Sequence, residues 1–504
     1  MCLKFESKGV LHQVLATCTS KLIPRRRLCR QIIRCKFWIF SPVNIVNYAH
    51  GAALGWVSPF LPLLQSEDSP LETGPVTVEQ GSWIGSILCL GGLFGAIVYG
   101  YLTEKIGVKK SIASLCISNM SFWTIVYFGT SVYHLYLARF LAGVTGGGVI
   151  VTFPLFIADI SDSKVRGALG SILALAGNSG ILTMYIVGDL LSYRTVPVVM
   201  ISLPTLFAIL MTLIPETPQS LLKQRNVTQA EQSLKFYSGL KSDQECTPEF
   251  KQQFEKLRNF ILNSKLQSDR LQLQDFTSPA AKKGILIGIF LMFLNQFCGV
   301  FAILTYAVSI FSESGSTLSP GTSAIIMGAI QIVGTIASFI FIDLAGRKVL
   351  LLISTYGTGL GLTCLGVYSW LRAQSVDLTG LDWIPIASLS LTVFLFCVGL
   401  CNIPFFVLPE LLPAKICNAG NTISMISITI FSFISLKVRY IASISITIHL
   451  LKNLYSQILP ILLEQIQLHG AVAIFASTCF IGGIVIALFI PETKGKNLVS
   501  PENV

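Results

Sequence analysis

Residues Gly284 to Phe311 read GILIGIFLMFLNQFCGVFAILTYAVSIF and contain no charged side chain in 28 positions. About 20 apolar residues suffice to cross the hydrocarbon core of a bilayer, so this segment is long enough to span it. The amides Asn295 and Gln296 nevertheless interrupt the apolar run. Because an amide in hydrocarbon is costly unless it has a partner or faces water, we expect this span to have a polar side.

On a continuous helix, Gln296, Gly299, Ile303 and Tyr306 would fall within an arc of about 80°. One interpretation is that this stripe faces a polar cavity inside a helix bundle. The alternative is that Gln296 only hydrogen-bonds a neighbouring helix, as intramembrane amides often do. We favour the cavity because of the pattern in the rest of the chain.

The composition is that of a polytopic helical membrane protein. The 504 residues are 52% apolar and 12% charged, with a mean hydropathy of +0.69, which is outside the range of soluble globular domains. The 13 cysteines lie mostly in apolar segments without metal-binding spacing, so we interpret them as small core residues. We find no P-loop, GxSxG or HExxH motif. We therefore predict that the protein is not an enzyme and holds no cofactor or metal.

Twelve apolar spans are predicted, six on each side of a polar segment. They cover approximately 37–63, 81–102, 111–130, 134–158, 167–188, 196–214, 284–311, 322–342, 349–371, 385–408, 418–436 and 470–490. The predicted organisation is a cytosolic basic tail (1–36), an N-terminal six-helix half (37–214), a cytosolic central loop (215–283), a C-terminal six-helix half (284–490) and a cytosolic C-terminal tail (491–504).

The distribution of Lys and Arg predicts the orientation. With the N-terminus inside, the cytosolic segments carry 30 of the 36 basic residues and the outer loops carry two. The first outer loop, 65–80, holds four acidic residues and no basic one. Cytosolic loops are enriched in Lys and Arg, so both termini and 215–283 are expected in the cytosol.

The two halves repeat three charged motifs in the same order. Each motif lies at the cytosolic end of a span, and the pairs are 239, 251 and 276 residues apart. We interpret these residues as a latch, whose ion pairs tie helix ends together in one state and break in the other; the alternative is an ordinary solvated loop. The latch residues are Glu104, Lys105, Lys109, Asp159, Arg166 and Glu216 in the first half, and Asp343, Arg347, Lys348, Glu410, Lys415 and Glu492 in the second. Duplicated halves of this kind suggest a transporter with its site at their interface.

The chain resembles a sugar porter of the major facilitator superfamily, and insect facilitated trehalose transporter-like proteins in particular. The resemblance covers about 40–500. It rests on the segments Gly51–Pro59, Gly100–Lys110, Arg139, Arg166–Gly167, Pro215–Pro218, Gln296–Gly299, Asp343–Lys348, Glu410–Pro413 and Pro491–Gly495. It implies an all-α polytopic membrane protein with the major facilitator fold, twelve transmembrane helices in two six-helix halves, working by alternating access.

The resemblance also assigns functional residues. The expected substrate-binding residues are Gln296, Asn295, Gln331, Asn402 and Asn178, with Tyr306 and Phe405 as apolar walls. Phe301 and Ala174 stand where the family has amides, so the polar ring is thinner and the identity of the sugar stays open. Arg139 keeps its family position inside span 4. We assign it to the latch and expect an acidic partner among Asp159, Glu104 and Glu216.

Residues 438–452 interrupt this pattern. Removing them leaves a sequence that resembles the family at the outer end of span 11 and reduces the third repeat offset from 276 to 261. Their apolar part has 12 residues, too few to span a bilayer. We predict an insertion at the outer face, as a helix extension or a loop, with a retained short intron as one possible origin.

We expect facilitative transport of a small neutral sugar, with trehalose or a hexose as candidates. Proton-coupled relatives carry a carboxylate in span 1, whereas this span has none, and we interpret His50 as a packing residue. The alternatives are a proton-coupled or non-sugar solute carrier and a non-transporting solute sensor. The expected partners are a small-molecule sugar and the lipid bilayer, without nucleic acid. We expect a monomer in the plasma membrane.

Overall fold

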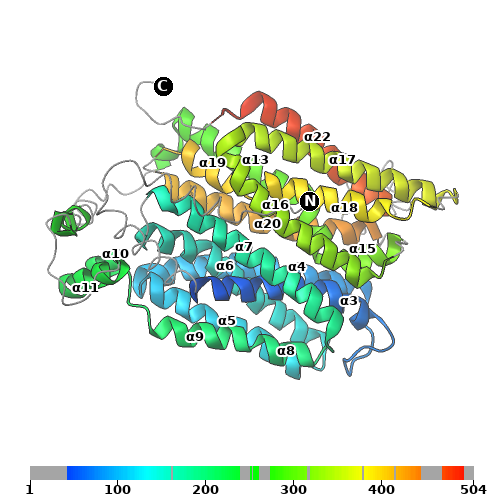
Figure 1. Cartoon of the computed structure of the whole chain (residues 1–504), viewed down its shortest axis with the longest axis horizontal. Helices are drawn as coiled ribbons and strands as arrows, with labels where there is room; N and C mark the ends of the chain where they lie inside the picture. Colours follow the sequence, from blue (N-terminus) through cyan, green and yellow to red (C-terminus); the bar gives the residue numbers. More distant parts are fainter. Residues whose placement is uncertain are drawn as a thin grey trace, which may run out of the picture.

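In a computed structural model, the chain is a bundle of long helices that run roughly side by side (Figure 1). The structure describes residues 42–160, 163–238, 250–252, 254–259, 273–314, 318–376, 380–413, 416–443 and 468–492. Within these ranges the regular secondary structure is helical, without a strand. The predicted tails lie outside the described residues, except for 491–492. Of the predicted insertion, α20 contains 438–443, and the remainder lies outside them.

The helices fall at the twelve predicted spans. The first half comprises residues 42–65, whose second part is α3 (Val57–Gln65), then α4 (Val78–Lys105), α5 (Val108–Phe128), α6 (Val132–Ile160), α7 (Ser163–Leu190), and α8 (Thr195–Met200) with α9 (Ser202–Thr212). The second half comprises α13 (Pro279–Phe297), α14 (Val300–Thr305) and α15 (Ala307–Ser314) as span 7, then α16 (Pro320–Ala345), α17 (Arg347–Ala373), α18 (Ile384–Val398) with α19 (Ile403–Leu411), α20 (Cys417–Ser443) and α22 (Leu468–Phe489).

Among the described residues, ten segments are long and apolar enough to cross a membrane. The interrupted span 1 and α20, with its apolar part Thr422–Leu436, complete the twelve-helix fold. Between the halves lie the short helices α10 (Pro218–Lys223), α11 (Val227–Tyr237) and η1 (Leu273–Phe276). The predicted fold class is therefore confirmed.

The two halves meet along a surface that we call the seam, where α3, α4 and α7 of the first half contact α15, α20 and α16 of the second. In Figure 1 the first half lies below and the second above, with α10 and α11 at one end of the bundle. The opposite end carries the connection from Gln65 to Val78, and we call it the 66–77 end.

The first half is held together by glycine contacts between α4 and α6. A Cβ atom at Gly143 would overlap the carbonyl oxygen of Leu88, and one at Gly147 would overlap that of Gly92. Small residues let two helix backbones approach closely where lipid provides no hydrophobic driving force between them. These glycines therefore set the distance between two long spans.

Spans 1, 6, 7 and 10 are interrupted in the described part of the bundle, and span 6 breaks at Ile201, between α8 and α9. Span 1 breaks at Trp56, span 10 breaks between α18 and α19, and span 7 breaks twice. In span 7 the first break is at Gly299, whose φ of 78° is left-handed, and the second is at Tyr306. The expected stripe on one continuous helix is therefore wrong, because the two breaks turn the segments of span 7 relative to one another.

We predict that Gly143→Ala destabilises the protein, because the new methyl group overlaps the backbone of α4. Overpacking of this kind costs about 1–3 kcal/mol. Replacing Gly by Ala in a helix gains about 1 kcal/mol of helix propensity. The net effect is therefore destabilising over most of that range. Gly100→Ala is the matched control, because no atom lies within 4 Å of its Cβ position. Thermal unfolding of purified protein measures the difference, and equal melting temperatures for the two variants would contradict the packing role.

Candidate functional site

The polar residues predicted in span 7 lie at the end of α13 and are buried. The side-chain amide of Asn295 donates to the carbonyl oxygen of Leu400 at 2.7 Å, and its Oδ1 accepts from Nε2 of Gln296 at 2.8 Å. Ser435 of α20 donates to the backbone carbonyl of Gln296 at 3.0 Å. Both polar groups of Asn295 are thus used inside the second half, so Asn295 supports span 10 and orients Gln296.

A second polar cluster crosses the seam between α7 and α16. Gln331 Nε2 donates to Asn178 Oδ1 at 3.0 Å, and Asn178 Nδ2 donates to Thr335 Oγ1 at 2.7 Å. Asn178 is half-buried and Gln331 is buried. The structure thereby brings two of the predicted site residues together, one from each half. Thr335, which sequence reasoning did not identify, completes the cluster one helical turn after Gln331.

Among the predicted site residues, two buried amide oxygens have no recorded hydrogen-bond partner in the described structure, Oε1 of Gln296 and Oε1 of Gln331. A buried acceptor without a partner is costly, and such groups often have a binding role. Each oxygen can accept a hydrogen bond from a hydroxyl group. These two atoms are therefore the strongest candidates for contacts with a polyhydroxylated solute.

The remaining predicted site residues are more dispersed. Asn402 begins α19 and makes one long bond, 3.4 Å, to the carbonyl of Cys397. The Tyr306 hydroxyl reaches across the seam to Gly85 of α4, where a Cβ would overlap it. Phe405 is half-buried and packs with Met292 and Leu408 in a separate apolar cluster. The structure thus groups Gln296 with Asn295, and Gln331 with Asn178, while Phe405 packs within the second half.

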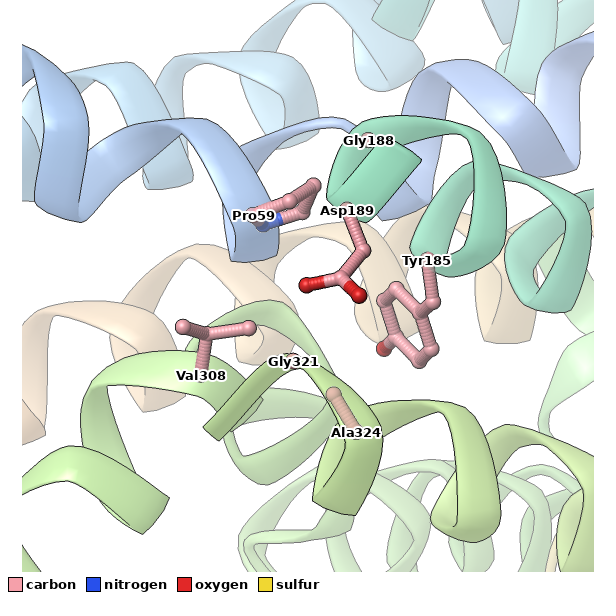
Figure 2. A pocket seen from close by; sticks show the side chains of 7 residues that line it. All are labelled: Pro59, Tyr185, Gly188, Asp189, Val308, Gly321 and Ala324. Carbon is pink, nitrogen blue, oxygen red and sulfur yellow. The ribbon is translucent and has the colours of Figure 1, made fainter. Parts of the chain in front are cut away.

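A cavity of about 120 Å³ lies on the seam, toward the 66–77 end. It is lined by Pro59, Tyr185, Gly188, Asp189, Val308, Gly321 and Ala324. Figure 2 shows the carboxylate of Asp189 pointing into this space, between elements of both halves. None of the predicted site residues lines it. No sequence pattern indicated this cavity, because its lining combines residues of spans 1 and 5 in the first half with residues of spans 7 and 8 in the second.

Arg139 is buried, and its described hydrogen bonds go to backbone carbonyls rather than to one of the predicted acidic partners. Its Nη1 donates to the carbonyl of Ala53 at 2.6 Å, and its Nε donates to the carbonyl of Ile84 at 3.0 Å. Ala53 lies just before the break of span 1, where α3 restarts at Val57 and the Ala53 carbonyl needs a new donor. The expectation of a carboxylate partner is therefore wrong, because the break supplies the acceptor for this charge.

At the end opposite 66–77, two glutamates of the predicted latch cap helices. Glu492 accepts from the backbone N–H groups of Arg347 and Lys348, both at 3.0 Å, at the start of α17. Glu216 accepts from the backbone N–H of Lys109 at 2.9 Å, at the start of α5. Each helix follows a glycine with positive φ, Gly107 (95°) or Gly346 (88°). The repeat found in the sequence is therefore a repeated helix cap.

Other latch residues also contact their own half. Thr217 donates to Asp159 at 2.7 Å, and Lys348 Nζ donates to the carbonyl of Ala487 at 2.7 Å. Lys105 lies over the ring of Tyr101, and Glu104 is exposed. That the latch residues form ion pairs in one state and lose them in the other remains a prediction. Lys415 and the side chains of Arg166, Asp343 and Glu410 lie outside the described residues.

The helix α11 is attached to the same end of the bundle. The hydroxyl of Tyr237 donates to the carbonyl of Pro215 at 2.9 Å, and its ring packs edge-on against Phe156 of α6. Burial, together with the nearby Glu216 and Asp159 carboxylates, raises the pKa of Tyr237, so its hydroxyl stays a donor. This contact ties the central segment to spans 4 and 6.

We predict that Glu492→Ala and Glu216→Ala each lower the melting temperature. Each variant removes a carboxylate from a helix N-terminus, which costs about 0.5–2 kcal/mol through lost hydrogen bonds and lost interaction with the helix dipole. Glu255→Ala is the matched control, because Glu255 is exposed and its ion pair with Arg258 spans only i,i+3. If all three variants had the melting temperature of the wild type, the capping role would be contradicted.

Comparison with known proteins identifies the family. The model of the family described as "Sugar (and other) transporter" matches residues 67–504. The facilitated trehalose transporter Tret1 of Bombyx mori is 31% identical over 426 residues, 84% of this chain and 78% of that protein. The Tret1 of Culex quinquefasciatus is 29% identical over 460 residues, 90% of this chain and 83% of that protein.

Solved structures show the same fold. The inward open conformation of the xylose transporter XylE from E. coli superposes with a TM-score of 0.70 at 18% identity, covering 92% of this chain and 98% of that one. XylE bound to 6-bromo-6-deoxy-D-glucose gives a TM-score of 0.69, also at 18% identity, with 92% and 97% coverage. With twelve spans in two halves and a match from residue 67 to the last residue, this chain belongs to the sugar (and other) transporter family.

Proposed function

We propose that the protein carries a small neutral sugar across the membrane by facilitated diffusion, using alternating access of a site between its halves. The observation that carries this proposal is the pair of unpartnered acceptors, Gln296 Oε1 and Gln331 Oε1, one within the second half and one on the seam. The relatives named as facilitated trehalose transporters make trehalose the first sugar to test. A hexose is the second.

The seam supports alternating access. Its described side-chain hydrogen bonds join Asn178 to α16, Tyr185 to Leu304, and Ser58 to Val308. These contacts run from the polar cluster toward the 66–77 end and hold the two halves in contact there, an arrangement that we call closed. A carrier needs such contacts to be few and individually modest, because each must break in every cycle.

The lack of an acidic side chain in span 1 (37–63) supports facilitated rather than proton-coupled transport, and the environment of Arg139 is compatible with it. A proton-coupled site needs a titrating group whose charge changes with the state of the carrier. Arg139 instead donates to two backbone carbonyls, which do not titrate. We therefore propose flux down the sugar gradient alone, with both termini and 215–283 in the cytosol of a monomeric plasma-membrane protein.

We predict that Gln296→Ala lowers uptake of radiolabelled trehalose or glucose about 5- to 150-fold, the effect of losing one or two hydrogen bonds to a neutral ligand. Uptake and counterflow are compared at matched surface expression. Asn119→Ala is the control, because Asn119 is a buried amide of α5 without a recorded partner, in the other half. Unchanged uptake in Gln296→Ala would refute the site. Loss of wild-type sugar flux when a proton gradient is collapsed would refute the proposal of facilitated diffusion.

We also predict that tags at either terminus are inaccessible to antibody in unpermeabilised cells, whereas a tag inserted between 66 and 77 is accessible. The basis is the excess of Lys and Arg in the segments assigned to the cytosol. Permeabilised cells provide the control for tag integrity. Antibody reaching a terminal tag in intact cells would contradict this orientation.

A further inference from the structure

The second break of span 7 leaves two backbone groups that would pair in an unbroken helix. In a continuous α-helix the N–H of Val308 donates to the carbonyl of Leu304, four residues earlier. Here α14 ends at Thr305, α15 begins at Ala307, and Tyr306 lies between them. Tyr306 has φ −115° and ψ 26°, outside the α-helical region, so the helix is interrupted between Leu304 and Val308. Both groups are inside the bundle, where an unmade hydrogen bond is costly.

Both groups have partners in the opposite half. The Val308 N–H donates to Ser58 Oγ at 3.2 Å, and the Tyr185 hydroxyl donates to the Leu304 carbonyl at 2.6 Å. Ser58 and Tyr185 are buried. Ser58 lies in α3 and Tyr185 in α7, so two spans of the first half hold the two sides of one break in the second. We call these two hydrogen bonds the seam clamp.

The breaks of spans 1 and 10 differ in this respect. The Ala53 carbonyl at the break of span 1 is held by Arg139, in the same half. At the break of span 10, Leu400 accepts from Asn295 and donates to Ser354, also in the same half. Rigid motion of one half against the other preserves these contacts. Compared with the breaks of spans 1 and 10, the second break of span 7 is the one whose described partners lie across the seam.

Alternating access requires the halves to separate at the 66–77 end, so this step rests on the function proposed above. Separation at this end must break both hydrogen bonds of the seam clamp. The freed Val308 N–H and Leu304 carbonyl are then each other's nearest partners in sequence. We propose that Ser58 and Tyr185 hold span 7 broken while this end is closed, and that the Val308–Leu304 hydrogen bond forms when it opens.

When this end closes, the hydrogen bond between Val308 and Leu304 is replaced by the two hydrogen bonds of the seam clamp. It makes Ser58 and Tyr185 positioning residues for α15, without contact to the sugar. The seam cavity lies directly beside them, because Tyr185 and Val308 both line it (Figure 2). Movement of α15 at this point therefore meets a space of about 120 Å³ rather than a packed core.

The test measures how often the 66–77 end opens. Ala324 is buried and lines the seam cavity, so Ala324→Cys serves as a reporter in the purified full-length protein. Its rate of labelling by a small maleimide rises with the fraction of open protein, and the protein without the reporter gives the background from native cysteines. Adding Ser58→Ala or Tyr185→Phe should raise the rate about 3- to 10-fold, as expected for the loss of one hydrogen bond from the closed state.

Three controls separate the clamp from a general loss of packing. Tyr193→Phe and Ser82→Ala each remove a buried hydroxyl that has no recorded partner, and they should leave the labelling rate unchanged. Ser58→Thr keeps the acceptor and should restore the wild-type rate. The melting temperatures confirm that all variants compared are folded.

The double variant tests the exchange itself. With both clamp residues removed, Val308 and Leu304 can pair in the closed state, so the combined increase should be smaller than the product of the two single increases. A full product would show two independent bonds and overturn the exchange. Equal labelling of the clamp variants and their controls would overturn the clamp. Neither result bears on sugar flux, because labelling needs no substrate, and the uptake assay tests transport separately.

Discussion

A helix that breaks inside a membrane leaves backbone N–H and C=O groups without partners, and lipid provides none. This constraint accounts for much of the polar chemistry in the bundle. Arg139, Asn295, Ser354, Ser58 and Tyr185 each bond a backbone group beside a break. Side chains that are costly to place in hydrocarbon are thus found where the backbone needs a hydrogen-bond partner.

The same constraint divides the molecule into parts that move and parts that do not. The breaks of spans 1 and 10 are satisfied within one half, and the glycine contacts of α4 with α6 fix the first half further. At the second break of span 7 the partners come from across the seam. A movement between the halves therefore acts on the backbone of span 7 directly, close to Gln296 in sequence and on the same span.

At the end of the bundle opposite 66–77, charged side chains also bind backbone groups. Glu216 and Glu492 each receive N–H groups from the first turn of a helix in their own half, after a glycine with positive φ. A carboxylate at a helix N-terminus is stabilised by the unpaired N–H groups and by the helix dipole. The repeated motifs thus have a structural role that does not depend on a change of state.

The sequence by itself determined the class of protein, the twelve spans, the duplication of the halves and the family, because apolar length, charge distribution and motif order are local properties of the chain. It also located Gln296 and Gln331, whose amides stand out in apolar surroundings. The partners of these residues could not be read in this way. The breaks at Tyr306 and between α18 and α19, the carbonyl partners of Arg139 and the use of Asn295 as a support all depend on which spans become neighbours. The seam cavity and the clamp depend on it too, since Ser58 and Val308 are 250 residues apart. Only the tertiary structure brings these groups within hydrogen-bonding distance, because a periodic pattern fixes which face of a helix is polar but not which atom that face meets.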